Sequence, residues 1–237
     1  VVLNGHRLEG RMEEVVHRLS AAGRRVLAMG DALPRDRLRS APDYPDSADP
    51  HLWMDPLLWG EAAQSLPAAL APLLPREPLA ANLAAYQAKL RRLHDYAVAA
   101  LAAIPASRRV LVTAHDAFGY FARRHGLTVD SIQGLSTEAE ATLIRIEALV
   151  SLLVERRIPA VFAETSVPDR AVLALIEGAA ARGHTVRLGG NLFSDSMGRS
   201  GSYEGTLEGM LDHNITTIAR ALGGDAPARG MNGRLRA

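Results

Sequence analysis

The sequence predicts an α/β fold of two lobes, each with a parallel β-sheet flanked by helices, joined by one long rigid linker helix. Two series of alternating strand and helix patterns with short connections support this, because such a rhythm places successive strands parallel in a sheet. A long helical pattern separates the two series. We therefore expect an N-terminal lobe at 1–76, a linker helix at 77–104 and a C-terminal lobe at 105–237. The chain of 237 residues is long enough to bury a core in one large domain or in two small lobes.

The first series opens the chain. An apolar strand at 1–3 turns at Asn4-Gly5 into a helix from about 8 to 22, and a second strand follows at 25–29. The chain begins directly on this core-like strand, without an initiator methionine or a signal peptide. We therefore expect a processed or truncated form that lacks the first part of the N-terminal lobe.

The segment at 31–50 breaks this rhythm. It collects prolines and aspartates without periodicity, and an irregular stretch this long is usually functional or disordered. A helix is expected from 56 to about 74, kinked or broken at Pro67. The linker pattern at 77–103 would extend roughly 37 Å at 1.5 Å per residue, longer than one small lobe needs. A long surface helix of a single domain is the alternative.

The second series fills the rest of the chain. Strands are expected at 109–113, 127–132, 159–164 and 185–188, and helices at 117–126, 141–157, 169–182 and 203–222. Ser136 or Thr137 would cap the second of these helices. Residues 223–237, rich in Gly, Ala and Arg, are expected to be frayed or disordered.

Composition excludes several classes of protein. The 27 basic and 26 acidic residues give a net charge of +1, and the arginines are scattered, so no nucleic-acid groove is expected. The chain has no cysteine, which excludes disulfides, thiolate zinc sites and cysteine nucleophiles and leaves His, Asp and Glu as strong metal ligands. This absence fits the cytosol and an envelope compartment equally. No apolar run reaches the ~18 residues that span a bilayer, so direct membrane insertion is not expected.

His51 stands between two Asp-Pro pairs, Asp49-Pro50 and Asp55-Pro56. Each proline fixes its own φ and disfavours the α region for the residue before it, so we expect a stiff, extended segment. An imidazole held in this way suits a metal. The alternative is a proline-rich loop that ends in a helix cap, with His51 merely exposed.

Three further residues follow predicted strands. His115 comes directly after the strand at 110–112, and ligands bind outside the carboxyl ends of parallel strands. Asp116 could orient its imidazole or cap a helix, and His115 could itself be the first residue of that helix. Asp195 lies after the last strand and a Gly-Gly turn, although Ser-Asp-Ser is also a turn signature. Glu164 ends another strand, where it could accept a hydrogen bond behind the same site or cap a helix.

The remaining histidines are weaker candidates. His17 and His94 fall among charged residues of helices and are expected to be solvated. His125 ends a helix, His184 lies in a turn, and His213 could bond another helix. His6 follows Asn-Gly at a strand end and could face a cleft.

Several short motifs, taken in order, carry a family resemblance over essentially the whole chain. They are Asn4-Gly5 with Leu8-Glu9, Asp49-Pro50-His51-Leu52-Trp53-Met54-Asp55, Thr113-Ala114-His115-Asp116-Ala117-Phe118-Gly119-Tyr120-Phe121, Phe162-Ala163-Glu164-Thr165-Ser166, Phe193-Ser194-Asp195-Ser196-Met197-Gly198, and Tyr203-Glu204-Gly205 with Asp212-His213-Asn214. Together they resemble the zinc and manganese solute-binding proteins of bacterial ABC transporters, the cluster A-I or TroA-like family.

The resemblance implies two α/β lobes joined by a rigid helix, with the metal between them. It implies that His51, His115 and Asp195 are metal ligands. The fourth ligand would be a histidine upstream of residue 1, and His6 does not match its motif. It further implies a non-enzymatic, high-affinity zinc-binding protein, a monomer, that delivers Zn²⁺ to a membrane permease. Its location would be the periplasm or, in a Gram-positive cell, the outer face of the membrane to which it is tethered.

The donor set favours zinc over manganese. Three imidazoles and one carboxylate suit zinc, whereas manganese prefers more oxygen ligands. In manganese-selective relatives the position of His115 is typically glutamate, yet some relatives with the present ligand set take manganese, which stays the alternative ion. Many zinc members carry a His-rich loop before the Asp-Pro-His motif. Here the loop instead offers aspartates, to which we assign a weak metal-gathering role: Asp31, Asp36, Asp43, Asp46 and Asp49.

Two other functions compete with transport. A zinc hydrolase would use three protein ligands and a water, with Glu164 or Asp116 as general base. The other alternative is a lectin-like or adhesin α/β module that binds no metal.

Overall fold

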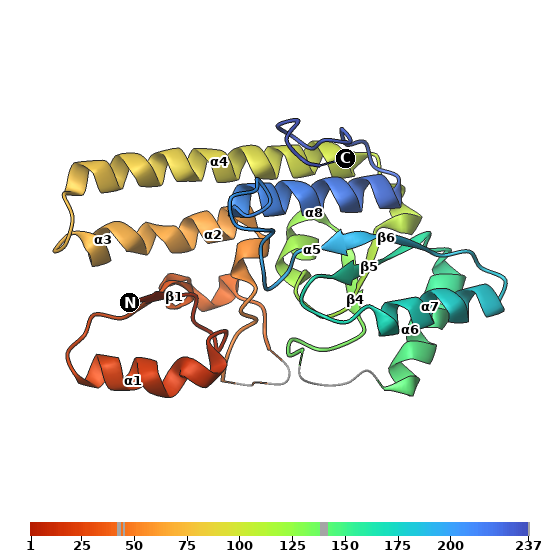
Figure 1. The fold of residues 1–237 in the computed structure, drawn as a ribbon, viewed down its shortest axis with the longest axis horizontal. Helices are drawn as coiled ribbons and strands as arrows, with labels where there is room; N and C mark the ends of the chain where they lie inside the picture. Colours follow the sequence, from red (N-terminus) through yellow and green to blue (C-terminus); the bar gives the residue numbers. More distant parts are fainter. Residues whose placement is uncertain (42–43, 45, 138–141, 237) are drawn as a thin grey trace. The chain divides into compact units, whose positions relative to one another are not determined.

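The computed structural model describes residues 1–41, 44, 46–137 and 142–236, which form two compact units, Val1–Arg91 and Arg92–Ala237 (Figure 1). The division falls within helix α4 (Arg76–Ala102), so the long helix predicted at 77–103 is confirmed as one element of 27 residues. Whether the lobes end at 76 and begin at 105 stays a prediction. Each unit is described by itself.

The first unit opens with the expected strand–helix–strand series. Strands β1 (Val2–Leu3) and β2 (Leu27–Ala28) pair in parallel, with helix α1 (Glu13–Ala21) between them. The helix starts later than predicted because the Glu9 carboxylate holds residues 4–9 in a turn, accepting from the backbone N–H of Asn4 and of Gly5. None of the α1 side chains is buried, since two strands of two residues offer little surface to cover them.

The Asp- and Pro-rich segment is ordered where the structure describes it. It contains short 3-10 turns at Met29–Ala32 and Arg35–Arg37 and an antiparallel bridge between Ser40 and Ala48. Of its aspartates, Asp43 lies outside the described residues and Asp49 is fully buried. A buried side chain cannot gather metal from solvent, so Asp49 must be removed from the predicted acidic loop.

A broken helix follows, as predicted from Pro67. It consists of a 3-10 turn at Leu52–Met54, α2 (Pro56–Ala62), a second 3-10 turn at Ala63–Ser65 and α3 (Leu66–Leu70). Asp55 caps α2, accepting hydrogen bonds from the N–H groups of Leu57 and Leu58 at 3.0 and 3.3 Å. Figure 1 shows α2 and α3 beside the first part of α4, where Trp59 Nε1 donates to the Tyr86 hydroxyl at 2.9 Å.

The second unit is the larger α/β layer. Strands β3 (Val110–Thr113) and β4 (Thr128–Ser131) pair in parallel, as do β5 (Ala160–Glu164) and β6 (Arg187–Leu192), and β3 lies next to β5. The predicted Gly-Gly turn is wrong: β6 continues through both glycines. A Cβ at Gly189 would lie 2.6 Å from the Phe162 ring, so a glycine there lets the two strands meet.

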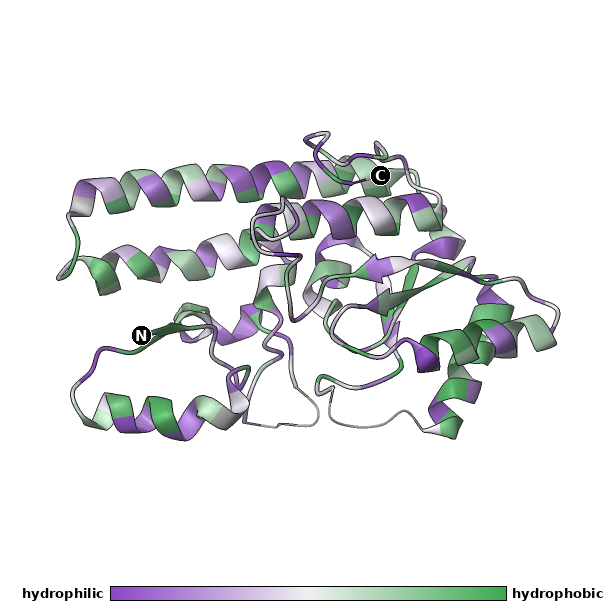
Figure 2. Cartoon of the chain, viewed as in Figure 1, coloured by the Kyte–Doolittle hydropathy of each residue, from purple (hydrophilic) through white to green (hydrophobic). Residues whose placement is uncertain are grey.

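Four helices complete this unit: α5 (Gly119–His125), α6 (Leu143–Arg156), α7 (Arg170–Ala181) and α8 (Leu207–Leu222). Leucine, valine and alanine side chains of α6 and α7 form one buried core with β3 and β5, and Figure 2 shows the hydrophobic stretches of these helices. The α6 cap is Thr142, not Ser136 or Thr137, and α8 begins at Leu207 with Thr206 as its cap. No helix in the described part of the chain is long and apolar enough to cross a membrane.

The C-terminal tail is fastened to α8, contrary to the expected fraying. Asp212 is fully buried and accepts hydrogen bonds from the Tyr203 hydroxyl, the Thr216 hydroxyl and the backbone N–H of Met231, at 2.9, 3.2 and 2.8 Å. Asn232 Nδ2 donates to the same Tyr203 hydroxyl at 2.8 Å. Burial raises the pKa of Tyr203, which therefore stays a hydrogen-bond donor to Asp212. The sequence showed the flexible composition of the tail but not its buried acceptor.

Replacement of Asp212 by alanine tests this fastening. Three donors would lose their acceptor, so we expect Asp212→Ala to lower the free energy of unfolding by about 2–4 kcal/mol and to speed tryptic cleavage in the tail. Urea denaturation and limited proteolysis measure the two effects. Asp225→Ala, at an exposed carboxylate in the first part of the tail, is the matched control and should change neither. A tail that is cut no faster in Asp212→Ala than in the control would contradict the account.

Candidate metal centre

In the first unit, His51 is buried and its imidazole is held by a carboxylate. The side chain of His51 is only 2% exposed, and its Nδ1 lies 2.7 Å from Asp49 Oδ1. The same oxygen accepts the backbone N–H of His51 at 3.0 Å, and Arg39 pairs with the other oxygen of Asp49. With the Nδ1 proton directed at Asp49, Nε2 is the nitrogen that carries the ligand lone pair.

The expected extended conformation of this segment is only partly right. His51 has φ −76° and ψ 44° and precedes the 3-10 turn at Leu52–Met54. The segment is stiff for an additional reason: Asn4 Nδ2 donates to the Pro50 carbonyl at 2.9 Å and ties it to the end of β1. The alternative of an exposed His51 is wrong because the side chain is buried, whereas the helix cap that this alternative included is present at Asp55.

In the second unit, His115 is fully buried at the carboxyl end of β3. The backbone N–H of His115 donates to Glu164 Oε1 at 2.8 Å, and its Nδ1 lies 2.6 Å from Glu164 Oε2. Glu164 is the last residue of β5, which runs beside β3, so the two strand ends bring these groups together. Helix α5 begins only at Gly119 and its cap makes no side-chain hydrogen bond, so neither His115 in the helix nor Asp116 as its cap is observed.

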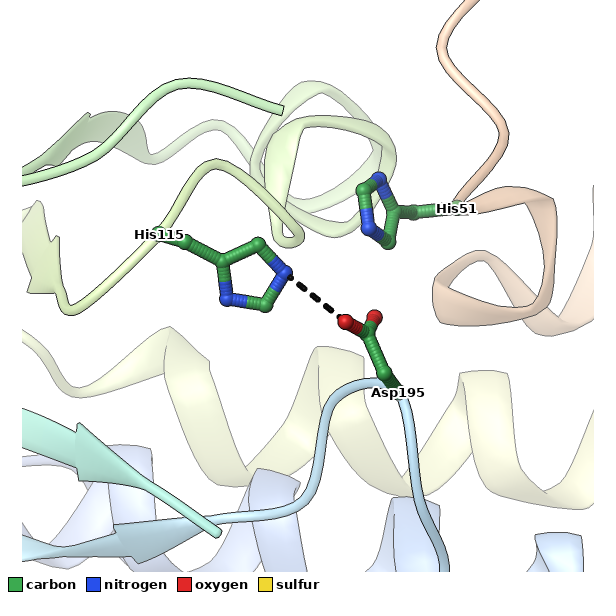
Figure 3. A group of neighbouring side chains, drawn as sticks. All are labelled: His51, His115 and Asp195. Carbon is green, nitrogen blue, oxygen red and sulfur yellow. Dashed lines mark ion pairs between the residues drawn. The ribbon is translucent and has the colours of Figure 1, made fainter. Parts of the chain in front are cut away.

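Asp195 approaches the other side of the same ring. Its Oδ2 lies 3.5 Å from His115 Nε2, the contact drawn as a dashed line in Figure 3. Burial of His115 opposes protonation, but the Asp195 and Glu164 carboxylates outweigh it and raise the pKa of His115 to about 9. In the metal-free protein a proton therefore occupies the ring between two carboxylates. A dication at Nε2 would replace that proton.

The loop that carries Asp195 is fixed at the two residues that precede it. Asn214 of α8 accepts from the N–H of Phe193 at 2.9 Å and donates to its carbonyl at 2.7 Å. The hydroxyls of Ser166 and Ser194 are 2.8 Å apart, which links this loop to the one after β5. These contacts account for the short motifs around Asp195 and Asn214, which the sequence alone could not connect.

The two histidines share one arrangement. Each is buried, and each has a carboxylate at Nδ1, which orients the ring and leaves Nε2 available for a ligand. Sequence analysis predicted this role for Glu164 as one possibility. It missed the role of Asp49 and counted this residue among the metal-gathering aspartates of the loop. The signal was present, because an aspartate two residues before the histidine can reach both its ring and its N–H.

The other histidines divide between packing and hydrogen bonding. His94 is not simply solvated: its ring centroid lies 5.4 Å from that of His125, and burial lowers the pKa of His125 to about 3. His184 and His213 bond to the carbonyls of Ile158 and Asn191, so His213 joins a helix to a strand and not to another helix. The His6 ring packs against Gly30.

Known proteins are similar to this chain over most of its length. Residues 1–221 match the family described as "Zinc-uptake complex component A periplasmic" (ZnuA). The chain is 41% identical over 224 residues to the zinc-binding protein TroA of Treponema pallidum and 40% identical over 224 residues to the manganese-binding lipoprotein MntA of Bacillus subtilis; each match covers 94% of this chain and 72% of the relative.

A solved structure is also similar to this chain. The structure described as the periplasmic zinc-binding protein TroA from Treponema pallidum superposes with a TM-score of 0.87, covering 93% of this chain and 79% of that one. The predicted two-lobed α/β fold is thereby confirmed. The chain belongs to the ZnuA family and is a metal-binding solute-binding protein of the ABC-transporter class.

Proposed function

We propose that the protein binds Zn²⁺ through His51, His115 and Asp195 and delivers it to the permease of an ABC transporter outside the cytoplasm. The observation that carries this proposal is the pair of buried imidazoles, each with a carboxylate on Nδ1. This arrangement holds histidine ligands in many zinc sites. The fourth ligand that the resemblance implies, a histidine in an earlier segment, stays a prediction.

The choice of zinc rests on donor chemistry. Similarity to the relatives does not identify the ion, because the zinc-binding and the manganese-binding protein are equally similar to this chain. Imidazole nitrogen is a borderline donor that zinc accepts readily in a four-coordinate shell, whereas manganese favours oxygen-rich shells of higher coordination number. Manganese is the alternative ion.

Transport without catalysis fits the geometry better than hydrolysis does. A hydrolase needs a carboxylate that can take a proton from a metal-bound water. Glu164 is instead engaged with both the backbone N–H and Nδ1 of His115. We infer that Glu164 orients a ligand and that the protein, as a monomer, carries its ion unchanged.

Metal preference is tested by titration of the metal-free protein with Zn²⁺ and Mn²⁺ against a competing chelator. We expect zinc to bind at least tenfold more tightly, and His115→Glu to reverse the order by supplying oxygen in place of nitrogen. His17→Gln, at an exposed histidine of α1, is the control and should bind zinc as the wild type does. A wild-type protein that prefers manganese would refute the assignment of zinc.

The orienting carboxylates are tested by Asp49→Asn and Glu164→Gln. Each keeps the size of the side chain but replaces the carboxylate by an amide, which weakens the hydrogen bond to the imidazole Nδ1. We therefore expect zinc affinity to fall about 10–100-fold. Asp36→Asn, an exposed aspartate of the same Pro-rich segment as Asp49, should leave the affinity unchanged. Wild-type affinity in both orienting variants would remove the argument on which the proposal rests.

The raised pKa of His115 predicts how stability depends on pH. The unfolded ring has a pKa near 6.5 and the folded ring one of about 9, so the folded state is favoured fully below about pH 6.5 and loses this advantage as pH rises through 9. We expect the metal-free protein to lose on the order of 2 kcal/mol of unfolding free energy over this range. Urea denaturation at several pH values measures the loss. If His115→Gln shows the same slope as the wild type, His115 is not its source.

A further inference from the structure

The second unit contains a cavity of about 300 Å³ that is lined by three arginines and by none of the proposed metal ligands. Arg187 comes from β6, Arg220 from α8 and Arg236 from the C-terminal tail. Three separate segments therefore contribute a cation to one hollow, and among the residues that the structure describes no aspartate or glutamate lines it. The whole chain is nearly neutral at +1, so its overall charge does not account for this cluster.

The positive charges are not neutralised by ion pairs. Within the described residues, none of the three guanidiniums lies within salt-bridge distance of a carboxylate. The Glu204 carboxylate accepts a hydrogen bond from the backbone N–H of Arg236 at 3.3 Å and interacts electrostatically with the Arg236 charge, but it forms no salt bridge with that guanidinium. Like charges that line one cavity repel one another, and an anion in the cavity would offset this repulsion.

Two of the arginines are held in place by backbone contacts. Arg187 Nη2 donates to the Ala221 carbonyl at 3.0 Å, and Arg220 Nη1 donates to the Ala226 carbonyl at 3.1 Å. A guanidinium has five donor hydrogens, so each keeps donors for a ligand. Such fixed, planar donors suit the several oxygens of a phosphate group, which they bind in bidentate fashion.

Further polar side chains lie in the wall of the cavity. Thr217 and His213 line it from α8, and His213 Nε2 is already bonded to the Asn191 carbonyl. The volume is at the small end of the range for ligand pockets, which fits a single phosphorylated group and not an extended polymer. The tail supplies Arg236 and one side of the hollow, so an occupant would also hold the tail.

We propose that this cavity binds a phosphate group, carried either by a small soluble molecule or by the headgroup of an anionic lipid. The proposal is independent of metal binding, because Arg187, Arg220 and Arg236 are none of the proposed ligands. Binding would use charge-assisted hydrogen bonds from the arginines and would protect the C-terminal tail.

The test compares two sources of the same group. Inorganic phosphate is titrated into the protein by calorimetry at constant ionic strength set with chloride, and flotation measures binding to phosphatidylglycerol–phosphatidylcholine vesicles and to pure phosphatidylcholine vesicles. Arg236→Gln is the principal variant. The Arg236 side chain makes no hydrogen bond to the described residues, so its replacement should preserve folding. Arg220→Gln is the second variant. Arg156→Gln, at an exposed arginine of α6, is the matched control.

We expect wild type and Arg156→Gln to bind one of the two probes and both cavity variants to bind it at least tenfold more weakly. Phosphate binding with this pattern identifies a soluble ligand, and binding only to the anionic vesicles identifies a lipid headgroup. Binding of neither probe, or equal binding by the cavity variants and the control, overturns the proposal. Circular dichroism and the urea midpoint verify that each variant is folded, and tryptic protection of the tail is a second readout.

Discussion

The candidate site depends on the contact between a buried imidazole Nδ1 and a carboxylate, made once in each unit. His51 meets Asp49 at 2.7 Å and His115 meets Glu164 at 2.6 Å. A buried carboxylate is costly unless it is paired, and here each also accepts a backbone N–H, which offsets part of that cost. The result is a ring with one orientation and one nitrogen left for an ion.

The surrounding fold supplies these contacts by different means. In the second unit the ends of two neighbouring parallel strands bring His115 and Glu164 together, although 49 residues separate them. In the first unit the carboxylate is only two residues from its histidine, and Asn4 and Arg39 fix the segment from outside. Asp195 stands on a loop pinned by Asn214 and by paired serine hydroxyls, and its contact with His115 keeps a proton on the ring until an ion takes its place.

Much of this could be predicted from the sequence, and the misses have physical reasons. Periodicity located α4, the strands of the second unit and the break at Pro67, because these are local properties. The position of His115 directly after a buried strand is also a local property, and it indicated that His115 is a metal ligand. By contrast, Asp49 was missed although it lies only two residues before His51, because no local pattern shows that this aspartate is buried. The ordered tail depends on Asp212, whose burial no local pattern reveals.

The central claim is that the ion binds Nε2 of both histidines while Nδ1 stays on its carboxylate. A crystal structure of the zinc-loaded protein, with an anomalous difference map at the zinc edge, tests it most directly. The account predicts one strong peak about 2.0–2.2 Å from Nε2 of His51, Nε2 of His115 and an Asp195 oxygen. A peak on Nδ1 of either ring, or one that lacks any of these three side chains, would contradict it.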